Sequence, residues 1–98
     1  MIYSKMVLTE KENWIKALRS DEYKQDKDAL RTKYGYCCLG VLFRTYTAKD
    51  PPLDAGTLSD RNCFDVGLDI SARDILTDMN DLEGKSFTEI ADWIEENL

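Results

Sequence analysis

The segment Tyr36–Tyr46 is the feature that most restricts how this chain can fold. It is apolar on nearly every side and contains two adjacent cysteines, although 33% of the 98 residues are charged. The length of the run favours a helix over a strand, and a helix that is apolar all round belongs in a core. We therefore predict a buried central helix, in which Gly40 lets another element approach closely. The prolines that follow Asp50 end it, because a residue before proline leaves the helical region.

Capping signals mark a helix near each end of the sequence. Thr9 and Glu12 have the spacing of a capping box, in which side chains and backbone N–H groups bond reciprocally, and they predict a helix over about residues 10–20. Ser86 and Glu89 have the same spacing. They predict a last helix with an apolar stripe at helical spacing, made of Phe87, Ile90, Ala91, Ile94 and Leu98.

The rest of the chain holds one more helix signal and two short β signals. Ser71 is a candidate cap for a third helix. Residues 30–32 predict a short extended piece, and the alternation of apolar and polar residues over 64–68 predicts a short half-buried strand. We expect a mainly α, small single domain over residues 1–98, with about four helices around a buried central helix and room for a minor β-hairpin. Residues 1–6 are expected to form a loose N-terminal tail.

The three cysteines are interpreted as packing residues rather than as reactive or metal-binding groups. The chain has no histidine, the usual partner of a cysteine nucleophile, and a structural zinc site needs four ligands. Free cysteine is among the most frequently buried residue types. The segment 78–89 resembles a calcium loop, but Leu82 and Glu83 stand where a ligand and a glycine belong, so we expect a turn and an N-cap there. No metal and no cofactor are expected.

Charge is divided unevenly between the two halves of the sequence. Residues 1–49 carry a net charge of +4 and residues 50–98 a net charge of −10. Such asymmetry marks an interaction surface if the halves form separate faces, and it is neutralised if they fold together. The outer face of the last helix, with a tryptophan among acids, is a candidate protein-binding surface made of Asp92, Trp93, Glu95 and Glu96. The alternative is a solvated acidic face with Trp93 at the edge of the core.

A second hypothesis is a site for a small anionic molecule such as a nucleotide signal. The N-terminal half holds cations, which bind phosphate, and tyrosines, which stack on bases, and the candidates are Lys24, Lys27, Arg31, Lys33, Arg44 and Tyr34. A small enzyme that uses carboxylates or a cysteine is a third hypothesis, although no spacing singles out a catalytic pair. Direct DNA binding is not expected, because no recognition helix follows the helix-turn-helix-like segment 86–94.

Three segments carry a family resemblance: "NWIKALRSDEYKQ", "YGYCCLGVLF" and "MNDLEGKSFTEIADWIEENL". Through them the chain resembles a widespread group of small proteins encoded by tailed bacteriophages. That group shares a tryptophan-containing N-terminal helix, a YCCLGVL-type segment and a C-terminal segment with Leu-Asn-Asp, Gly, Ser-Phe and Glu-Ile-Ala elements. In this sequence the Leu-Asn-Asp element is Met79-Asn80-Asp81. The resemblance implies a phage or prophage origin and an accessory role, and it brings no catalytic residues.

The leading functional hypothesis is therefore a phage accessory protein that binds a bacterial host protein stoichiometrically. Its preferred form is an inhibitor of a defence protein, such as a nucleic-acid-binding effector, because an acidic surface can occupy a groove built for the nucleic-acid backbone. The N-terminal stretch lacks the apolar core of a signal peptide, and no apolar run is long enough to span a bilayer. We accordingly expect the protein in the cytoplasm of the host cell. Its oligomeric state stays open.

Overall fold

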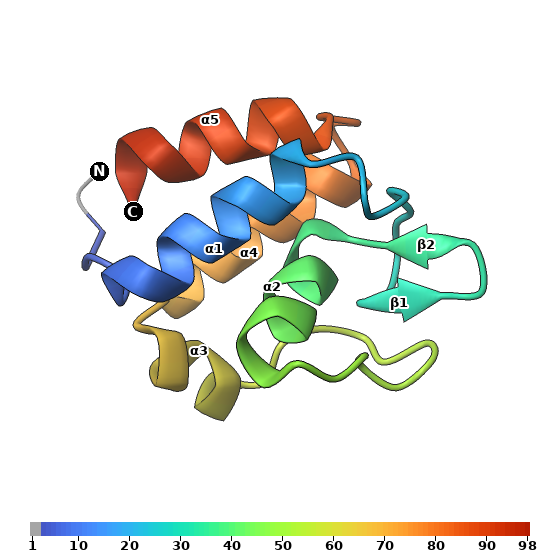
Figure 1. Cartoon of the computed structure of the whole chain (residues 1–98), viewed down its shortest axis with the longest axis horizontal. Coiled ribbons are helices and arrows are strands. Elements are labelled where there is room, and N and C mark those ends of the chain that lie inside the picture. Colours follow the sequence, from blue (N-terminus) through green and yellow to red (C-terminus); the bar gives the residue numbers. More distant parts are fainter. Residues whose placement is uncertain (1–2) are drawn as a thin grey trace.

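The computed structural model describes residues 3–98, which form five helices and one two-stranded antiparallel hairpin (Figure 1). The prediction of a mainly α fold with a minor β-hairpin is confirmed. None of the helices in this part of the chain is long and apolar enough to cross a membrane. The elements are α1 (Leu8–Arg19), β1 (Arg31–Thr32), β2 (Gly35–Tyr36), α2 (Cys38–Thr47), α3 (Asp60–Val66), α4 (Ile70–Asp81) and α5 (Phe87–Asn97).

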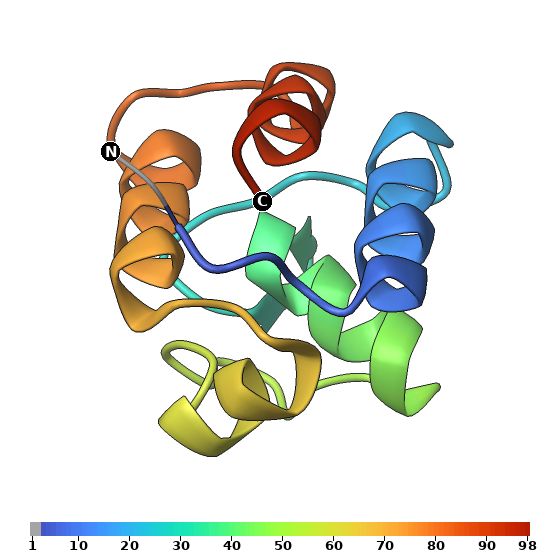
Figure 2. The same cartoon turned by 90° about the vertical axis from the view of Figure 1, so that its left-hand side faces the viewer.

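The predicted central helix is α2. Its first five residues are all buried, and α1, α4 and β2 pack against it. Figure 2 shows α1 and α4 on opposite sides of the molecule, with α5 above and α3 below. The prediction for Gly40 is also confirmed: a methyl group there would overlap the backbone carbonyl of Leu30, which accepts the Cys37 N–H at 3.2 Å.

The side chain of Asn80, near the end of α4, joins four segments of the chain. Asn80 is only 4% exposed, and its Nδ2 donates to the Asp26 carbonyl at 2.9 Å. Its Oδ1 accepts from the Cys38 N–H at 3.2 Å and from Gln25 Nε2 at 2.9 Å. Gln25 in turn accepts the Phe87 N–H of α5 at 3.1 Å. Because a buried amide is costly to leave unpaired, this network fixes how α2, α4, α5 and the loop before the hairpin meet.

The predicted strand over residues 64–68 is wrong, because this region contains α3 followed by a turn. The buried residues Cys63 and Val66 are three apart, which is a helical spacing, whereas Phe64 is 82% exposed. Ser59 accepts the Asn62 N–H at 3.1 Å and so caps the helix. The alternation read from the sequence included Phe64, and it therefore gave the wrong period.

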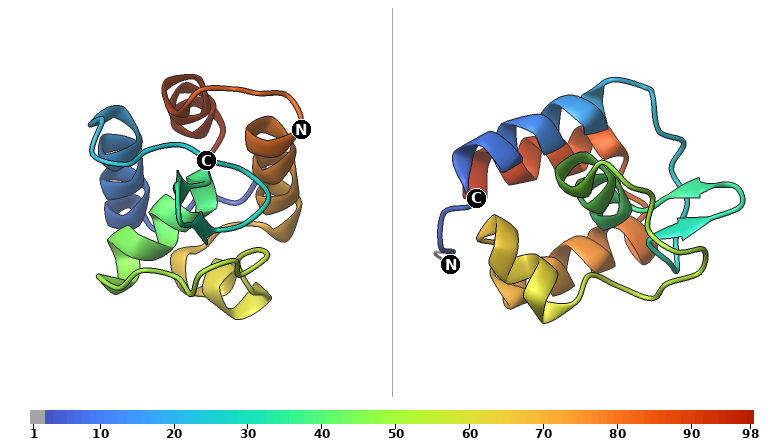
Figure 3. Two further views of the ribbon diagram at one scale, coloured as in Figure 1. Left: turned by 90° about the vertical axis from the view of Figure 1, so that its right-hand side faces the viewer. Right: turned by 60° about the horizontal axis from the view of Figure 1, so that its bottom comes forward.

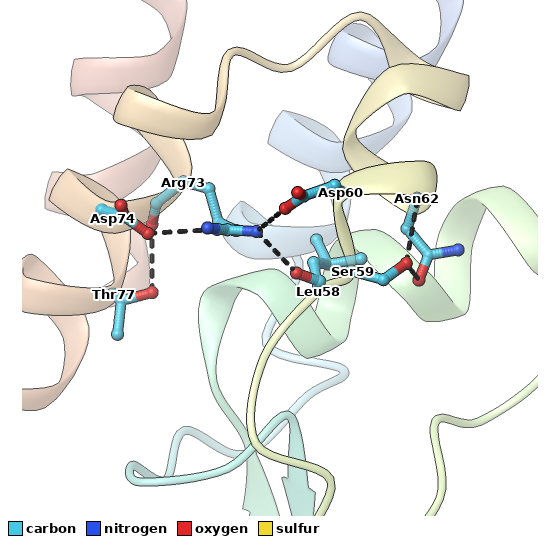
Figure 4. A network of polar contacts seen from close by, with 7 residues as sticks. All are labelled: Leu58, Ser59, Asp60, Asn62, Arg73, Asp74 and Thr77. Carbon is cyan, nitrogen blue, oxygen red and sulfur yellow. Dashed lines mark hydrogen bonds and ion pairs between the residues drawn. The ribbon is translucent and has the colours of Figure 1, made fainter.

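A second polar network ties α3 to α4 (Figure 4). Arg73 of α4 donates to the Leu58 carbonyl at 3.1 Å and to the Asp60 carboxylate at 2.8 Å. It also bonds to Asp74, its neighbour on α4, at 3.1 Å. The Arg73 side chain is 14% exposed, so the guanidinium is a structural group that holds the start of α3 against α4.

The described part of the expected N-terminal tail is not loose; residues 1–2 lie outside the described residues. Met6 is 5% exposed and its N–H donates to the Leu98 carbonyl at 3.1 Å. The Ser4 N–H donates to the Asp69 carboxylate at 2.7 Å. Backbone bonds to distant segments therefore hold residues 3–6 in place.

Two predicted helix starts are also wrong. α1 begins at Leu8, before the predicted residue 10, and no side chain caps it, so the Thr9–Glu12 capping box does not form. The N–H of Val7, the residue before the helix, donates instead to the Val66 carbonyl at 3.0 Å. α4 begins at Ile70 with Asp69 before it, so Ser71 lies inside the helix rather than at its cap.

Candidate protein-binding surface

The start of α5 has the geometry that its sequence predicts. Ser86 Oγ accepts the Glu89 N–H at 3.1 Å, and Glu89 Oε1 accepts the Ser86 N–H at 3.0 Å, which completes the capping box. The bond from the Ser86 backbone lowers the pKa of the Glu89 carboxyl. All five residues of the predicted apolar stripe are buried. The outer face of α5 carries the four candidate residues Asp92, Trp93, Glu95 and Glu96.

Two of the candidate acids turn towards α1. Arg19 bonds to Asp92 at 2.7 Å and to Glu95 at 3.2 Å, and these hydrogen bonds, that to Asp92 first, raise the pKa of the guanidinium. Glu96 is exposed and takes part in no ion pair among residues 3–98. The two halves of the sequence therefore neutralise each other along the contact between α1 and α5, but not at Glu96.

Trp93 lies at the edge of the core. It is half-buried, and the Tyr3 ring meets it edge-on with the ring centroids 5.6 Å apart. Next to Trp93 a groove of about 360 Å³ separates α5 from the end of α4, and we call it the α4–α5 groove. It is lined by Met79, Lys85, Glu89, Asp92, Trp93 and Glu96.

Three of these lining residues were not among the sequence candidates. A signal for Glu89 was present, because Glu89 and Glu96 are two helical turns apart and share one side of α5 with Trp93 between them. Lys85 directly precedes the Ser86 cap of α5, whereas Met79 belongs to α4 and reaches the groove only because α4 packs against α5. A second groove, of about 640 Å³, lies between the end of α5 and the N-terminal segment with the start of α1, and its residues include Lys5, Lys11, Glu95 and Glu96.

The residues proposed for a small anion are distributed over several places. Arg31 donates to the Pro51 carbonyl at 2.9 Å, and Arg44 pairs with Asp50 at 3.5 Å. Asp50 also accepts the hydroxyl of Tyr36, whose pKa is raised first by burial and then by this bond. Both arginines therefore have partners within the protein.

The remaining cations of that group lie around the hairpin, which forms one end of the molecule (Figure 3). Lys33 and Tyr34 occupy its turn and line a pocket of about 450 Å³ that also contains Asp26 and Asp54. Lys24 and Lys27 are exposed on the preceding loop. The hairpin pocket contains two of the six candidates, and its carboxylates oppose an anionic ligand.

The interpretation of the cysteines as packing residues is confirmed. Cys37, Cys38 and Cys63 are free and buried. Burial raises the pKa of Cys37 to about 11 and also raises those of Cys38 and Cys63. Since the thiolate is the reactive form, none of these thiols is prepared for nucleophilic chemistry.

The calcium-like segment is occupied by other interactions. The Asn80 side chain belongs to the buried network described above, and Glu89 closes the α5 capping box. The predicted turn and N-cap are present between α4 and α5. Within the part of the chain that the structure describes, no group of three or more His, Cys, Asp or Glu side chains is placed to hold a metal ion.

Comparison with known proteins identifies one family. Neither a curated protein nor a solved structure matches the chain. A family model matches residues 6–62, from Met6 through α1, the hairpin and α2 into α3, and leaves α4 and α5 outside the match. Because the match covers more than half of the 98 residues, the chain belongs to the family described as Domain of unknown function (DUF8296).

Proposed function

We propose that this protein is a phage-encoded accessory protein that binds one bacterial host protein stoichiometrically and inhibits a defence system, of the anti-CRISPR or another anti-defence type. The observation that carries the proposal is the acidic outer surface of α4 and α5 beside a half-buried tryptophan. Exposed carboxylates on these two helices and their connection are Asp74, Asp78, Glu83, Glu89, Asp92, Glu95 and Glu96. Residues 69–98 contain two cations, and one of them, Arg73, is engaged with α3.

The physical basis of the proposal is electrostatic complementarity. A surface with one sign of charge speeds encounter with an oppositely charged partner and excludes partners of like charge. Proteins that hold nucleic acid present cationic grooves, and a folded acidic surface competes for them. An aromatic side chain among these charges supplies apolar contact area of the kind that interface anchors provide. The site of action under this proposal is the cytoplasm of the host bacterium.

A plating experiment tests this function. Bacterial strains that each carry one defence system are challenged with phage, with and without expression of the chain. We expect plating to be restored in at least one strain, and the chain to co-purify from that strain with a component of the defence system at a fixed molar ratio. The double variant Glu89→Gln/Glu96→Gln should lose both effects, and Gln at position 89 still accepts the Ser86 N–H. The matched variant Glu12→Gln/Glu22→Gln, which changes two exposed acids of the N-terminal half by the same charge, should retain them.

Two results would contradict the proposal. One is unchanged plating in every strain, with no host protein retained at a fixed ratio. The other is a heat of binding to a nucleotide in calorimetry, lost on substitution of Lys24, Lys27 or Lys33, which would favour the small-anion hypothesis instead. If the protein competes with nucleic acid for a phosphate-binding groove, its affinity for the captured protein must fall as the salt concentration rises, because such competition is electrostatic.

A further inference from the structure

We infer that the α4–α5 groove receives a cationic helix of the partner protein, with an apolar side chain placed over Trp93 and Met79 and a basic side chain at each end. This inference rests on the proposed function, since it names the part of the host protein that the surface would bind. The sequence alone predicts a contact on the outer face of α5, whereas this inference places the contact between α4 and α5.

The groove has an apolar part, here called its floor, which consists of Met79 and Trp93, and both residues are held in place. Met79 is 7% exposed and packs in the core, and Trp93 packs against the same core from the edge. The edge-on contact with Tyr3 at 5.6 Å orients the Trp93 ring. A preorganised floor lowers the entropy lost on binding. With a volume of about 360 Å³, the groove holds side chains from one face of the partner helix, whose backbone lies across the opening.

The carboxylates define what can lie along this floor. Glu89 and Glu96 are two helical turns apart, about 10 Å along α5, and Trp93 lies between them. A partner helix with basic residues one turn before and one turn after an apolar residue reproduces this spacing. Laying such a helix in a groove is a recurrent mode of peptide recognition.

The net charge of the groove selects a cation over an anion. Glu89, Asp92 and Glu96 line it together with one ammonium group, Lys85. Arg19 partly neutralises Asp92, and Glu89 also accepts the Ser86 N–H, so Glu96 is the least engaged of the three carboxylates. An acidic peptide or a nucleic-acid backbone would bring like charges together, which disfavours binding.

The first test uses a synthetic peptide as the probe. An alanine-based helix with one leucine, and a lysine one turn before and after it, is titrated into the whole protein by calorimetry. We expect it to bind at least about tenfold more tightly than a peptide of equal composition with its lysines on the opposite face. Glu89→Gln/Glu96→Gln, which keeps an acceptor for the Ser86 N–H, should weaken binding at least about tenfold, and Glu12→Gln/Glu22→Gln less than about twofold. Equal affinity for the two peptides, or an equal effect of the two variants, would show that net charge alone acts and would overturn the inference.

The second test separates this inference from the proposed function. A photo-crosslinking residue is placed at Lys85, which lines the groove without being one of its acids, and the captured host protein is mapped. Crosslinks to a basic helical segment support the inference. Crosslinks to an acidic or extended segment, or to nucleic acid, overturn it while leaving stoichiometric inhibition in place. A different result would overturn the proposed function instead. In that result, expression of the chain changes phage plating in no strain, while the peptide still binds and the two double variants still differ in affinity for it.

Discussion

The Sγ atoms of Cys37 and Cys38 both face backbone groups inside the protein. Cys37 accepts the Gly40 N–H at 3.4 Å and so caps α2, while Cys38 donates to the Leu76 carbonyl at 3.6 Å. The carbonyl of Cys38 accepts the indole N–H of Trp14 at 2.8 Å. Small side chains at these two positions let α1 and α4 pack closely against the start of α2.

Burial predicts slow thiol chemistry. With the pKa of Cys37 raised to about 11 and that of Cys38 also raised, the thiolate fraction at neutral pH is very small. We expect an aromatic disulfide reagent to react with the native protein about a hundredfold more slowly than with the denatured protein, because reaction requires opening of the core. The denatured chain should titrate three thiols. Rapid stoichiometric reaction of one thiol in the native state would contradict the packing role and would indicate a chemical role for that cysteine.

Gly40 allows a prediction in which two opposing effects can be compared. Alanine at this position gains about 1 kcal/mol of helix propensity, but its methyl group would overlap the Leu30 carbonyl, and such overpacking costs about 3 kcal/mol. Gly40→Ala should therefore lower the free energy of unfolding in urea by about 2 kcal/mol. At Gly56 an added methyl group meets nothing within 4 Å, so Gly56→Ala should leave stability unchanged or raise it by up to about 1 kcal/mol. Equal effects of the two substitutions would mean that the Leu30 backbone moves away at little cost.

At the scale of the elements, α4 and α5 depend on Asn80 for their relation to α2. Asn80→Ala leaves the buried Cys38 N–H and one Gln25 N–H without their acceptor. We expect a loss of about 2 kcal/mol or more in the free energy of unfolding, since unsatisfied buried donors are costly. Asn13→Ala on the exposed surface of α1 is the matched control and should change stability by less than about 0.5 kcal/mol. Similar losses for both would contradict the role of Asn80 as a buried connection.

Elements with local signals could be predicted from the sequence, and those fixed by distant contacts could not. The α5 capping box lies within four consecutive residues, and its prediction is confirmed. The α1 box fails because the helix begins at Leu8 and Thr9 lies inside it, while the Val7 N–H before the helix bonds to Val66, far along the chain. α3 could not be predicted because Phe64, Val66 and Leu68 alternate with polar residues as in a strand. Only the fold shows that Phe64 is exposed, so that it does not belong to a buried face.

The same distinction applies to the candidate surface. The helical period of α5 alone turns Trp93 and Glu96 away from the apolar stripe, so their position could be predicted. The pairing of Asp92 with Arg19 depends on how α1 packs against α5, and the contribution of Met79 depends on α4. Neither contact leaves a spacing signal in the sequence.

At the scale of the whole molecule, the excess of acids in the C-terminal half of the sequence remains as an acidic surface on one side only. Arg19 draws two acids of α5 towards α1, and Arg44 pairs with Asp50. α4 lies across the molecule from α1, so its acids are remote from the cations of that helix (Figure 2). The acidic surface thus follows α4 and the adjoining side of α5, where the groove opens.

The N-terminal segment completes this surface, and its contribution can be measured. Tyr3 packs edge-on against Trp93, which places a residue from the start of the described chain on the last helix. Tyr3→Ala should lower the free energy of unfolding by about 1–2 kcal/mol, whereas Tyr3→Phe, which keeps the ring, should cost less than about 0.5 kcal/mol. A double-mutant cycle with Trp93→Ala should give a coupling energy of about 0.5–1.5 kcal/mol between the two rings.

Trp93 fluorescence provides an independent measurement of the same contact. Trp14 is fully buried and Trp93 half-buried, so removal of Tyr3 should act on Trp93 emission, moving it to longer wavelength and making it easier to quench with acrylamide. Tyr3→Phe should leave both properties unchanged. A coupling energy of zero together with unchanged quenching would show that Tyr3 does not orient Trp93. The groove floor would then lack the preorganisation on which binding of a partner helix depends, and affinity for the lysine–leucine peptide should be equal in the wild-type protein and the Tyr3→Ala variant.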